Sequence, residues 1–407
     1  MKTNGKTNFV IIVTILFLSL ISGGVNAQET AKKPANQSVA RPAFRMPVAI
    51  KSAEILPDNS VIFRLVSKDA GSVSVSGDWM PGFGSSVPMV KNDTSLWTLT
   101  VGPLKPELYS YTFLIDGIRV LDPNNSQVKR DGNRNESMFL IPGTESDLYF
   151  VKNVPHGTLS KVWYESPSLK LSRRLYVYTP PGYEDSQGKY PVFYLLHGGG
   201  GDEDAWTTLG RTCQIMDNLI SQGKAKPIIV VMPNGNPGQA AAFTEAPVNP
   251  AVSAPYDMGM GLFEESMVKD IIPFVESHYR VIPDRDDRAL AGLSMGGMQT
   301  LTLTGNYPSM FGYIGVMSMG LVDVTTMGLK PDPDQDTKFE TLKNSGYKLY
   351  WVGVGKDDFL YKSVQTLRSS LDKHGLNYTY RESTGGHSWA NWRIYLSEFT
   401  PQLFRQN

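Results

Sequence analysis

The chain has 407 residues, a length for which about two or three domains are expected. Lys plus Arg and Asp plus Glu each number 39, so the formal net charge is zero, and neither a nucleic acid nor an acidic membrane surface is indicated as a partner. A hydrophobic content of 41% and a charged content of 19% are typical of a globular chain and exclude a disordered one. The single cysteine, Cys213, excludes a disulfide framework within the chain and a zinc site built from cysteines.

The first 27 residues have the pattern of a secretory signal peptide. Lys2 and Lys6 give a positively charged start, residues 9–21 form an apolar run, and small residues lead up to Ala27. The apolar run is shorter than the roughly 20 residues that span a bilayer, so a membrane anchor is the weaker interpretation. We expect cleavage after Ala27, no integral membrane segment in the mature chain, and a secreted or periplasmic protein of bacterial type. Residues 28–47 are polar, contain three prolines and are expected to form a flexible linker.

Residues 48–152 alternate between apolar and polar positions in short segments. The period of two is clearest in residues 62–65, 73–76, 97–101 and 109–113, which are separated by turn residues. Short strands with regular turns predict a small β-sandwich of the immunoglobulin type. Trp79 and Trp97 could stack on sugar rings, but aromatic residues in a small sandwich more often fill its core, so a packing or spacer role is the stronger interpretation.

Residues 153–407 have a different texture, in which short apolar runs alternate with helical stretches. The runs are typical of strands buried on both faces of a parallel sheet, and they cover residues 191–196, 227–232, 289–293, 313–317 and 349–354. The helical stretches cover residues 205–222, 263–279, 295–306, 362–374 and 390–403. Residues 173–179 predict an antiparallel first strand, and Pro273 should kink or interrupt its helix. This order predicts an α/β doubly wound sheet.

The sequence Gly292–Gly296 matches G-x-S-x-G between a predicted strand and a predicted helix. In this context the serine occupies a sharp, strained turn that projects its hydroxyl above the sheet, and side chains at the flanking glycines would clash. We therefore expect Ser294 to be a catalytic nucleophile. The backbone N–H of Met295, at the start of the helix, is expected to stabilise the oxyanion that forms during attack.

A serine nucleophile needs a base and an acid, and in this fold both follow the serine in the order acid, then histidine. Only His374 and His387 follow Ser294. His374 belongs to a charged helix end and is expected at the surface or in a C-terminal capping role, whereas His387 follows two glycines in a loop and is the predicted base. The acid is expected in the loop after the preceding strand, where Asp358 is favoured and Asp357 remains the alternative.

The segment His197–Gly201 follows a predicted strand and matches the HGGG type of oxyanion loop. Its glycines allow the backbone to approach a substrate, and Gly199 is the predicted second oxyanion donor, with Gly198 and Gly200 as alternatives. His197 is expected to be structural, because His387 already supplies the base. A phosphate-binding loop is not indicated, because no Gly-Lys-Ser/Thr sequence follows.

Three aromatic residues are candidates for a substrate pocket, and each is equally suited to the core: Trp206, Phe243 and Trp389. Neither a metal site nor a cofactor is expected from the residues. The oligomeric state is left open by the sequence.

The region of residues 157–404 resembles the esterase D-like branch of the α/β-hydrolases, and specifically carbohydrate esterase family one. The matching segments are residues 176–183, 195–200, 270–276, 288–297 and 385–389. The resemblance implies an α/β-hydrolase fold and the triad Ser294, Asp358 and His387. Residues 75–79 and 109–113 of the N-terminal module resemble the early-set immunoglobulin-like modules of carbohydrate-active enzymes, which implies a module like those that bind carbohydrate.

Members of this family include feruloyl and acetylxylan esterases. The favoured hypothesis is a secreted serine esterase that releases ferulate from arabinoxylan through an acyl-enzyme, with feruloylated or acetylated xylan oligosaccharides as substrates. The alternatives are an acetylxylan esterase, a siderophore esterase, and a non-hydrolytic carbohydrate-binding protein or acyltransferase. A spacer role for the N-terminal module further predicts that deletion of residues 28–150 leaves the turnover of small esters largely unchanged.

Overall fold

A computed structural model describes residues 50–81, 84–245, 261–322 and 332–405. The predicted signal peptide, residues 1–27, and the predicted linker, residues 28–47, lie outside these ranges. Ala49–Asn407 form one unit by their contacts. Within the described ranges, none of the helices is long and apolar enough to cross a membrane.

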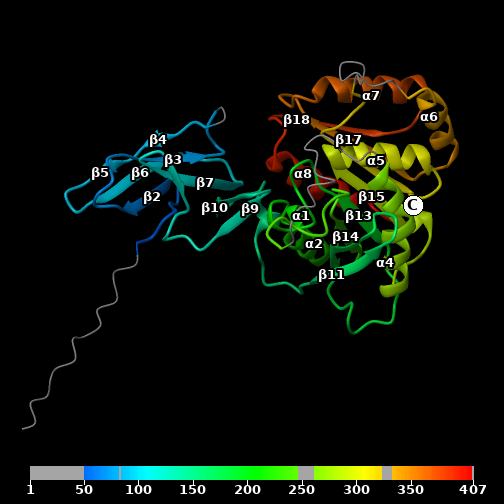
Figure 1. Cartoon of the computed structure of the whole chain (residues 1–407), viewed down its shortest axis with the longest axis horizontal. Helices are drawn as coiled ribbons and strands as arrows, with labels where there is room; N and C mark the ends of the chain where they lie inside the picture. The colour runs from blue at the N-terminus through cyan, green and yellow to red at the C-terminus, as the bar shows by residue number, and fades with distance from the viewer. Residues whose placement is uncertain (1–49, 82–83, 246–260, 323–331, 406–407) are drawn as a thin grey trace, which may run out of the picture. The chain divides into compact units, whose positions relative to one another are not determined.

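The N-terminal part of this unit consists of two antiparallel sheets (Figure 1). One sheet contains, in spatial order, β1 (Glu54–Ile55), β2 (Val61–Val66), β6 (Leu96–Val101) and β5 (Val90–Lys91). The other contains, in spatial order, β4 (Val87–Pro88), β3 (Val73–Gly77), β7 (Leu108–Ile115), β10 (Arg134–Leu140) and β9 (Val128–Asp131), and β8 (Ile118–Val120) pairs with β7. The predicted all-β region is thereby confirmed, and residues 50–141 are called the β module below.

One apolar core joins the two sheets of the β module. Phe63 of β2 and Phe113 of β7 are fully buried in it, as the period-two pattern predicts. Trp97 is buried as well, and the ring of Trp79 stacks on Phe63 with 5.6 Å between the centroids. Both tryptophans therefore pack in the module's core, which agrees with the interpretation that favoured packing over sugar stacking.

The C-terminal part contains one eight-stranded sheet. Its strands, in spatial order, are β11 (Thr158–Ser166), β12 (Leu171–Thr179), β14 (Ile229–Pro233), β13 (Val192–Leu196), β15 (Arg288–Leu293), β16 (Tyr313–Met317), β17 (Leu349–Gly355) and β18 (Thr379–Ser383). From β14 to β18 all neighbours are parallel, whereas β12 is antiparallel to both β11 and β14. The predicted doubly wound sheet is confirmed, and residues 173–179 lie in an antiparallel strand as predicted. They belong to the second strand, however, because β11 precedes them and was not predicted.

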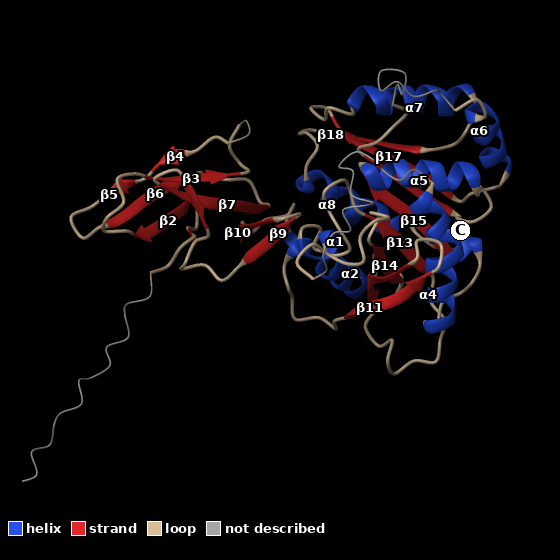
Figure 2. Ribbon diagram, viewed as in Figure 1, coloured by secondary structure: helices blue, strands red, loops and turns tan. Residues whose placement is uncertain are grey.

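Helices cover both faces of this sheet (Figure 2), because alternate residues of its strands are apolar on each side. On β13, Val192 and Tyr194 belong to one core, and Phe193 and Leu195 belong to the other. The first core is covered by α3 (Leu262–Ser266), α4 (Ile272–His278), α5 (Met295–Asn306), α6 (Gln335–Asn344) and α7 (Tyr361–Lys373). The second is covered by α1 (Ala205–Thr208), α2 (Thr212–Ser221) and α8 (Trp389–Phe399).

The predicted helices are present, with local interruptions. Between α3 and α4 the chain forms a π-helical turn, Met267–Ile271, and Pro273 lies in the first turn of α4, so the proline marks a break as predicted. The predicted helix 205–222 is divided into α1 and α2 at Arg211, whose φ of 57° is left-handed. Short 3₁₀ turns are also present at Asp147–Tyr149 (η1), Arg285–Asp287 (η3) and Thr400–Gln402 (η5).

The segment between β10 and β11 belongs structurally to the α/β part. Tyr149 in η1 is 1% exposed and belongs to the second core of the sheet, which also contains Tyr176 and Tyr178. Its backbone oxygen accepts hydrogen bonds of 3.0 and 2.8 Å from the guanidinium of Arg211. The α/β part therefore includes η1, which precedes its first strand.

Candidate active site

Ser294 lies between β15 and α5 in a strained backbone conformation, with φ 50° and ψ −118°. L-residues rarely adopt such angles, and they persist only where the surrounding structure enforces them. A Cβ at Gly292 would collide with the carbonyl of Gly296, and one at Gly296 would lie 2.6 Å from the carbonyl oxygen of His197. The glycines of the motif are thus required by close backbone approach, and the turn has the form of a nucleophile elbow.

His387 is paired with Asp358. The Nδ1 atom of His387 lies 3.0 Å from each carboxylate oxygen of Asp358, whose side chain is fully buried. An ionised carboxylate only accepts hydrogen bonds, so Nδ1 carries the proton and Nε2 is left to act as a base. Asp357 is exposed, and its backbone N–H donates to the carbonyl of Gly385. The structure therefore brings Asp358, and not Asp357, to the imidazole.

The carboxylate of Asp358 is held in its ionised form by its neighbours. Burial raises its pKa, but hydrogen bonds from His387, from the N–H of Leu360 and from the hydroxyl of Ser318 outweigh burial, so the pKa lies below its usual value. Ser318 directly follows β16 and accepts a 2.9 Å hydrogen bond from Nε1 of Trp392. Ser318 was not predicted from the sequence, although its position at the carboxyl end of a parallel strand was a usable signal.

The imidazole of His387 is also flanked by two aromatic rings. Phe359 approaches with 4.5 Å between ring centroids, and Trp392 makes an edge contact at 4.9 Å. Phe359 is 75% exposed, which leaves an apolar surface beside the histidine open to solvent. Neither residue was identified from the sequence, because each could equally have belonged to the core.

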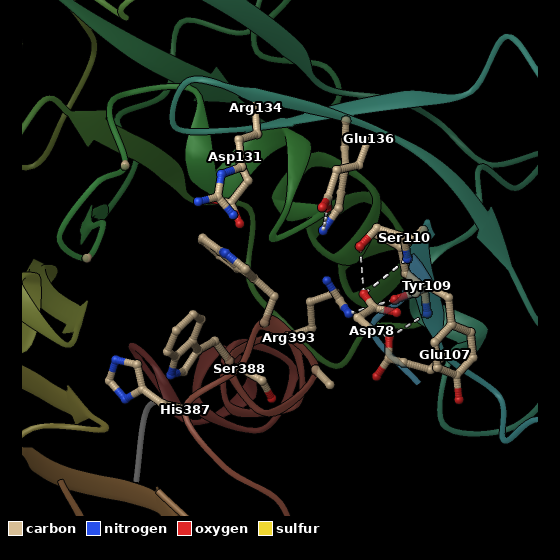
Figure 3. Close-up of a pocket in the computed structure, with 18 of the residues that line it drawn as sticks. Asp78, Glu107, Tyr109, Ser110, Asp131, Arg134, Glu136, His387, Ser388 and Arg393 are labelled. Carbon is tan, nitrogen blue, oxygen red and sulfur yellow. Dashed lines mark hydrogen bonds and ion pairs between the residues drawn. The ribbon is translucent and has the colours of Figure 1, made fainter. Parts of the chain in front are cut away.

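Ser294 and His387 line the same pocket, which has a volume of about 620 Å³. Figure 3 shows His387 there together with residues of the β module such as Asp131 and Arg134. Other residues of the α/β part that line it include Gly198, Gly199, Gly201, Leu293, Trp389 and Arg393. The β module contributes polar and charged residues, including Asp78, Tyr109, Lys129, Asp131, Arg134 and Glu136. This contribution of the module was not predicted from the sequence, because the pocket joins segments that are remote in the chain.

The glycine-rich loop after β13 lies against the serine. A Cβ at Gly198 would be 3.2 Å from the Cβ of Ser294, so only glycine fits at this position without displacement. Gly199 also lines the pocket and has open space around its Cα. Met295 directly follows the serine and is the first residue of α5, where backbone N–H groups have no partner within the helix. The two predicted oxyanion segments are therefore both beside Ser294.

Both ring nitrogens of His197 make hydrogen bonds, one of them to this loop. Its Nε2 accepts a 2.8 Å hydrogen bond from the N–H of Gly235, so its Nδ1 carries the proton and donates to the carbonyl of Gly198 at 2.8 Å. Burial lowers the pKa of His197, which keeps the ring neutral. These contacts agree with the expectation of a structural histidine.

The three predicted pocket aromatics have different surroundings. Trp389 lines the pocket. Trp206 is 1% exposed, donates a 2.9 Å hydrogen bond to the carbonyl of Leu196 and supports Trp389 by an edge contact from the core. Phe243 is half exposed and is not among the described residues that line the pocket. In the described part of the chain, no group of three or more His, Cys, Asp or Glu residues is placed to hold a metal ion.

Comparisons with known proteins agree with this architecture. A family model described as "Putative esterase" matches residues 166–403, which is more than half of the chain. The "Endo-1,4-beta-xylanase/feruloyl esterase" of Xylanibacter ruminicola is 34% identical over 358 residues, a match that covers 84% of this chain and 44% of the relative. The chain thus spans less than half the length of that relative.

Two solved structures are similar in fold. A CE1 ferulic acid esterase from Anaeromyces mucronatus, in complex with ferulic acid, has a TM-score of 0.52 and 25% identity, covering 63% of this chain and 95% of that chain. The enterobactin esterase of Shigella flexneri has a TM-score of 0.60 at 17% identity, and it covers 84% of this chain and 92% of its own. The first similarity has the extent of the α/β part, and the second extends beyond it. Because the family model covers most of the α/β part with its serine, acid and histidine, the chain belongs to this esterase family.

Proposed function

We propose that the protein is an exported serine carboxylesterase that releases ferulate from feruloylated arabinoxylan. The observation that carries the proposal is the convergence in one pocket of a serine at a strained elbow and a histidine paired with a buried aspartate. The names of the relatives, a xylanase/feruloyl esterase and a ferulic acid esterase, support this substrate class.

The proposed reaction proceeds through an acyl-enzyme. The Oγ atom of Ser294 attacks the ester carbonyl while Nε2 of His387 takes its proton, and Asp358 stabilises the resulting imidazolium. The N–H groups of Met295 and Gly199 stabilise the tetrahedral oxyanion, with Gly198 and Gly200 as the alternatives to Gly199. The imidazolium then protonates the leaving sugar alkoxide, and an activated water releases ferulate by the same steps in reverse.

The surroundings of the pocket support an aromatic acyl group on a carbohydrate. Trp389 lines the pocket, and Phe359 provides an exposed aromatic surface beside His387. The β module supplies charged and polar groups such as Asp131 and Arg134, which suit the hydroxyl groups of a sugar. We propose feruloylated xylan oligosaccharides as the substrates on this basis, and acetylated ones as the alternative.

One assay separates these substrates. The purified protein is incubated with wheat arabinoxylan oligosaccharides, and both ferulate and acetate are quantified by chromatography. Release of ferulate well in excess of acetate is expected, and the reverse ratio would identify an acetylxylan esterase.

The nucleophile is tested with Ser294→Ala. We expect this variant to lose release of ferulate from methyl ferulate while it retains the circular dichroism spectrum and melting temperature of the wild type. Ser277→Ala, which removes an exposed hydroxyl from α4, is the matched control and should behave as the wild type. Undiminished turnover by Ser294→Ala would exclude the proposed mechanism.

Export is proposed from the N-terminal sequence, whose charged start, apolar run and small residues end at Ala27. N-terminal sequencing of protein recovered from the periplasm or the culture medium should begin at Gln28. Full-length chain confined to the cytoplasm would contradict export and leave the chemistry of the site unaffected.

A further inference from the structure

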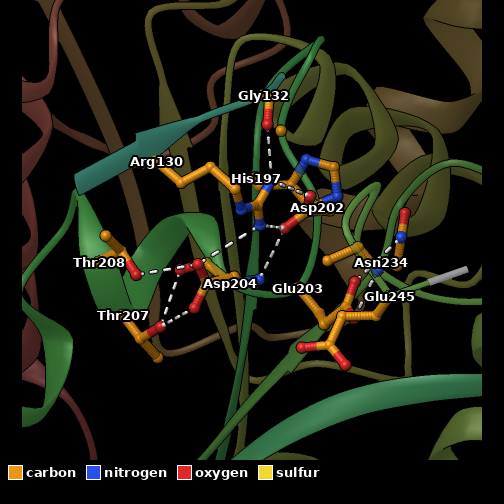
Figure 4. A network of polar contacts seen from close by, with 12 residues as sticks. Arg130, Gly132, His197, Asp202, Glu203, Asp204, Thr207, Thr208, Asn234 and Glu245 are labelled. Carbon is orange, nitrogen blue, oxygen red and sulfur yellow. Dashed lines mark hydrogen bonds and ion pairs between the residues drawn. The ribbon is translucent and has the colours of Figure 1, made fainter. Parts of the chain in front are cut away.

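The β module contacts the oxyanion loop through one hairpin. Strands β9 and β10 are joined by a turn at Gly132, whose φ of 58° is left-handed, and Arg130 is the penultimate residue of β9. The guanidinium of Arg130 donates a 2.7 Å hydrogen bond to each carboxylate oxygen of Asp202 and lies 3.3 Å from Asp204 (Figure 4). Such a two-pronged arrangement fixes distance and angle together, which a single ion pair does not.

Asp202 is the residue that directly follows the glycines of the oxyanion loop. It is 3% exposed, and its carboxylate also accepts a 3.0 Å hydrogen bond from the N–H of Asp204 at the start of α1. Burial raises the pKa of Asp202, but the hydrogen bond and charge of Arg130 outweigh burial, so the pKa lies below its usual value. Asp202 is therefore an ionised, buried group whose charge is balanced by the β module.

A second contact joins the same hairpin to the same loop. A Cβ at Gly132 would lie 2.9 Å from the carbonyl oxygen of Gly200, so the turn is in close contact with the oxyanion loop. Arg130 also donates a 2.7 Å hydrogen bond to the carbonyl of Gly132, which ties the turn to the guanidinium. The ionic and the steric contact thus come from one small structural element.

The α/β part contacts the oxyanion loop at its first and last glycines. His197 fixes the carbonyl of Gly198, and Nδ2 of Asn236 donates a 2.8 Å hydrogen bond to the carbonyl of Gly201. A run of four glycines has more backbone freedom than any other tetrapeptide, so its geometry depends on such external contacts. An oxyanion donor is effective only when it is oriented before the charge develops.

We propose that Arg130 is a positioning residue for the oxyanion hole, through which the β module pre-orients the N–H groups of residues 198–200. The inference rests on the proposed function, because it assigns Arg130 to the same reaction. It concerns the oxyanion and not the acyl group, so it holds for any ester that Ser294 cleaves.

The test compares Arg130→Gln with Arg211→Gln, using 4-nitrophenyl acetate as the substrate. Arg211 also joins the chain ahead of β11 to the α/β part, through the carbonyl of Tyr149, but it makes no contact with the oxyanion loop. We expect Arg130→Gln to lower kcat roughly tenfold or more with little change in KM, because loss of an oriented donor affects the transition state selectively. Arg211→Gln should lower the melting temperature without this selective loss of kcat.

A readout specific for the oxyanion accompanies the kinetics. A phenylboronic acid inhibits by forming a tetrahedral adduct with the serine hydroxyl. Free ferulate binds without forming such an adduct. Arg130→Gln should weaken inhibition by the boronic acid by about the same factor as kcat, and Arg130→Lys should restore part of both. The proposal is wrong if Arg130→Gln has the kcat of the wild type and is inhibited by the boronic acid as strongly as the wild type is. It is also wrong if Arg211→Gln shows the same losses as Arg130→Gln.

Two further measurements distinguish a folding defect, or a failure of the proposed function, from a failure of this proposal. If Arg130→Gln does not fold, Asp202→Asn removes the same ion pair while its amide oxygen can still accept from Asp204, and the same changes in kcat and boronic acid affinity are expected. Failure of the proposed function is seen separately, as turnover of 4-nitrophenyl acetate by Ser294→Ala or as absence of ferulate release by the wild type.

Discussion

The two sides of the reacting serine are held by different parts of the chain. On one side, His387 is fixed by Asp358, Ser318 and Trp392, all of which belong to the α/β part. On the other side, the oxyanion loop is held partly by the α/β part and partly by Arg130 of the β module. Proton transfer should therefore be a property of the α/β part alone, and oxyanion stabilisation a property of both parts. Four perturbations test this division.

Asp358→Asn is expected to have the largest effect. An amide at this position can donate to Nδ1 of His387, which shifts the proton to Nε2 and leaves no base for the serine. The loss of a triad aspartate costs about 10⁴-fold in kcat in other serine hydrolases, and a loss of that order is expected here, measured with methyl ferulate. Asp357→Asn is the control and should retain activity, because Asp357 is exposed. Equal losses in both variants would remove the distinction between the two aspartates.

Removal of the β module should have the next largest effect. The sequence favoured an independent spacer, but the structure gives reason to expect that deletion of residues 28–145 lowers kcat for small esters at least about tenfold, because the loop loses Arg130. The longer deletion, residues 28–150, also removes buried Tyr149 and should cost a further ~3 kcal/mol or more of stability. Kinetics and thermal unfolding of both truncations measure this. Full activity of the shorter one would show that the loop needs no support from the module.

Ser318→Ala should act on the proton-transfer side with a smaller effect. It removes a hydrogen bond from Asp358 and leaves the buried Nε1 of Trp392 unpaired, at a cost of about 1–3 kcal/mol. The low pKa of ionised Asp358 stabilises the fold above the usual carboxyl pKa, and this stabilisation is lost as the pH falls through the folded value. In the variant that pKa rises, so acid unfolding should begin at a higher pH. A fluorescence titration measures the shift, and an unchanged midpoint would contradict the assignment.

His374→Gln lies outside both sides of the site and should have the smallest effect. His374 is the C-cap residue of α7, and its hydrogen bonds with Glu340 and Asp336 of α6 raise its pKa. Its contribution to stability is therefore complete below the pKa of a free histidine and is lost as the pH rises through the folded pKa. The difference in melting temperature between wild type and variant should shrink from pH 6 to pH 9, with esterase activity unchanged throughout.

Much of the proton-transfer side was predictable from sequence, because its signals are local. The G-x-S-x-G turn requires glycines at fixed offsets, and the order of the triad leaves two histidines, of which His387 alone follows a glycine pair. The choice between Asp357 and Asp358 was less certain, because adjacent residues differ only in which side of the turn they occupy. In the structure only Asp358 is directed to the imidazole.

The support of the oxyanion loop could not be predicted in the same way. Arg130 and Asp202 are 72 positions apart, and neither belongs to a motif that would indicate the other. Helix α6 was missed because its sequence is polar and only Phe339 and Leu342 are buried. Trp206 could not be separated from pocket residues, since burial in the core and exposure in a pocket both suit a tryptophan. These features depend on tertiary packing, for which a single sequence carries no local signal.

The central claim is that one serine hydroxyl becomes acylated. The most direct measurement is mass spectrometry of protein quenched during turnover of 4-nitrophenyl ferulate, followed by peptide mapping. We predict a feruloyl group on the peptide that carries Ser294, and none on that peptide in Ser294→Ala. A feruloyl group on another residue, or steady turnover by Ser294→Ala, would contradict the account.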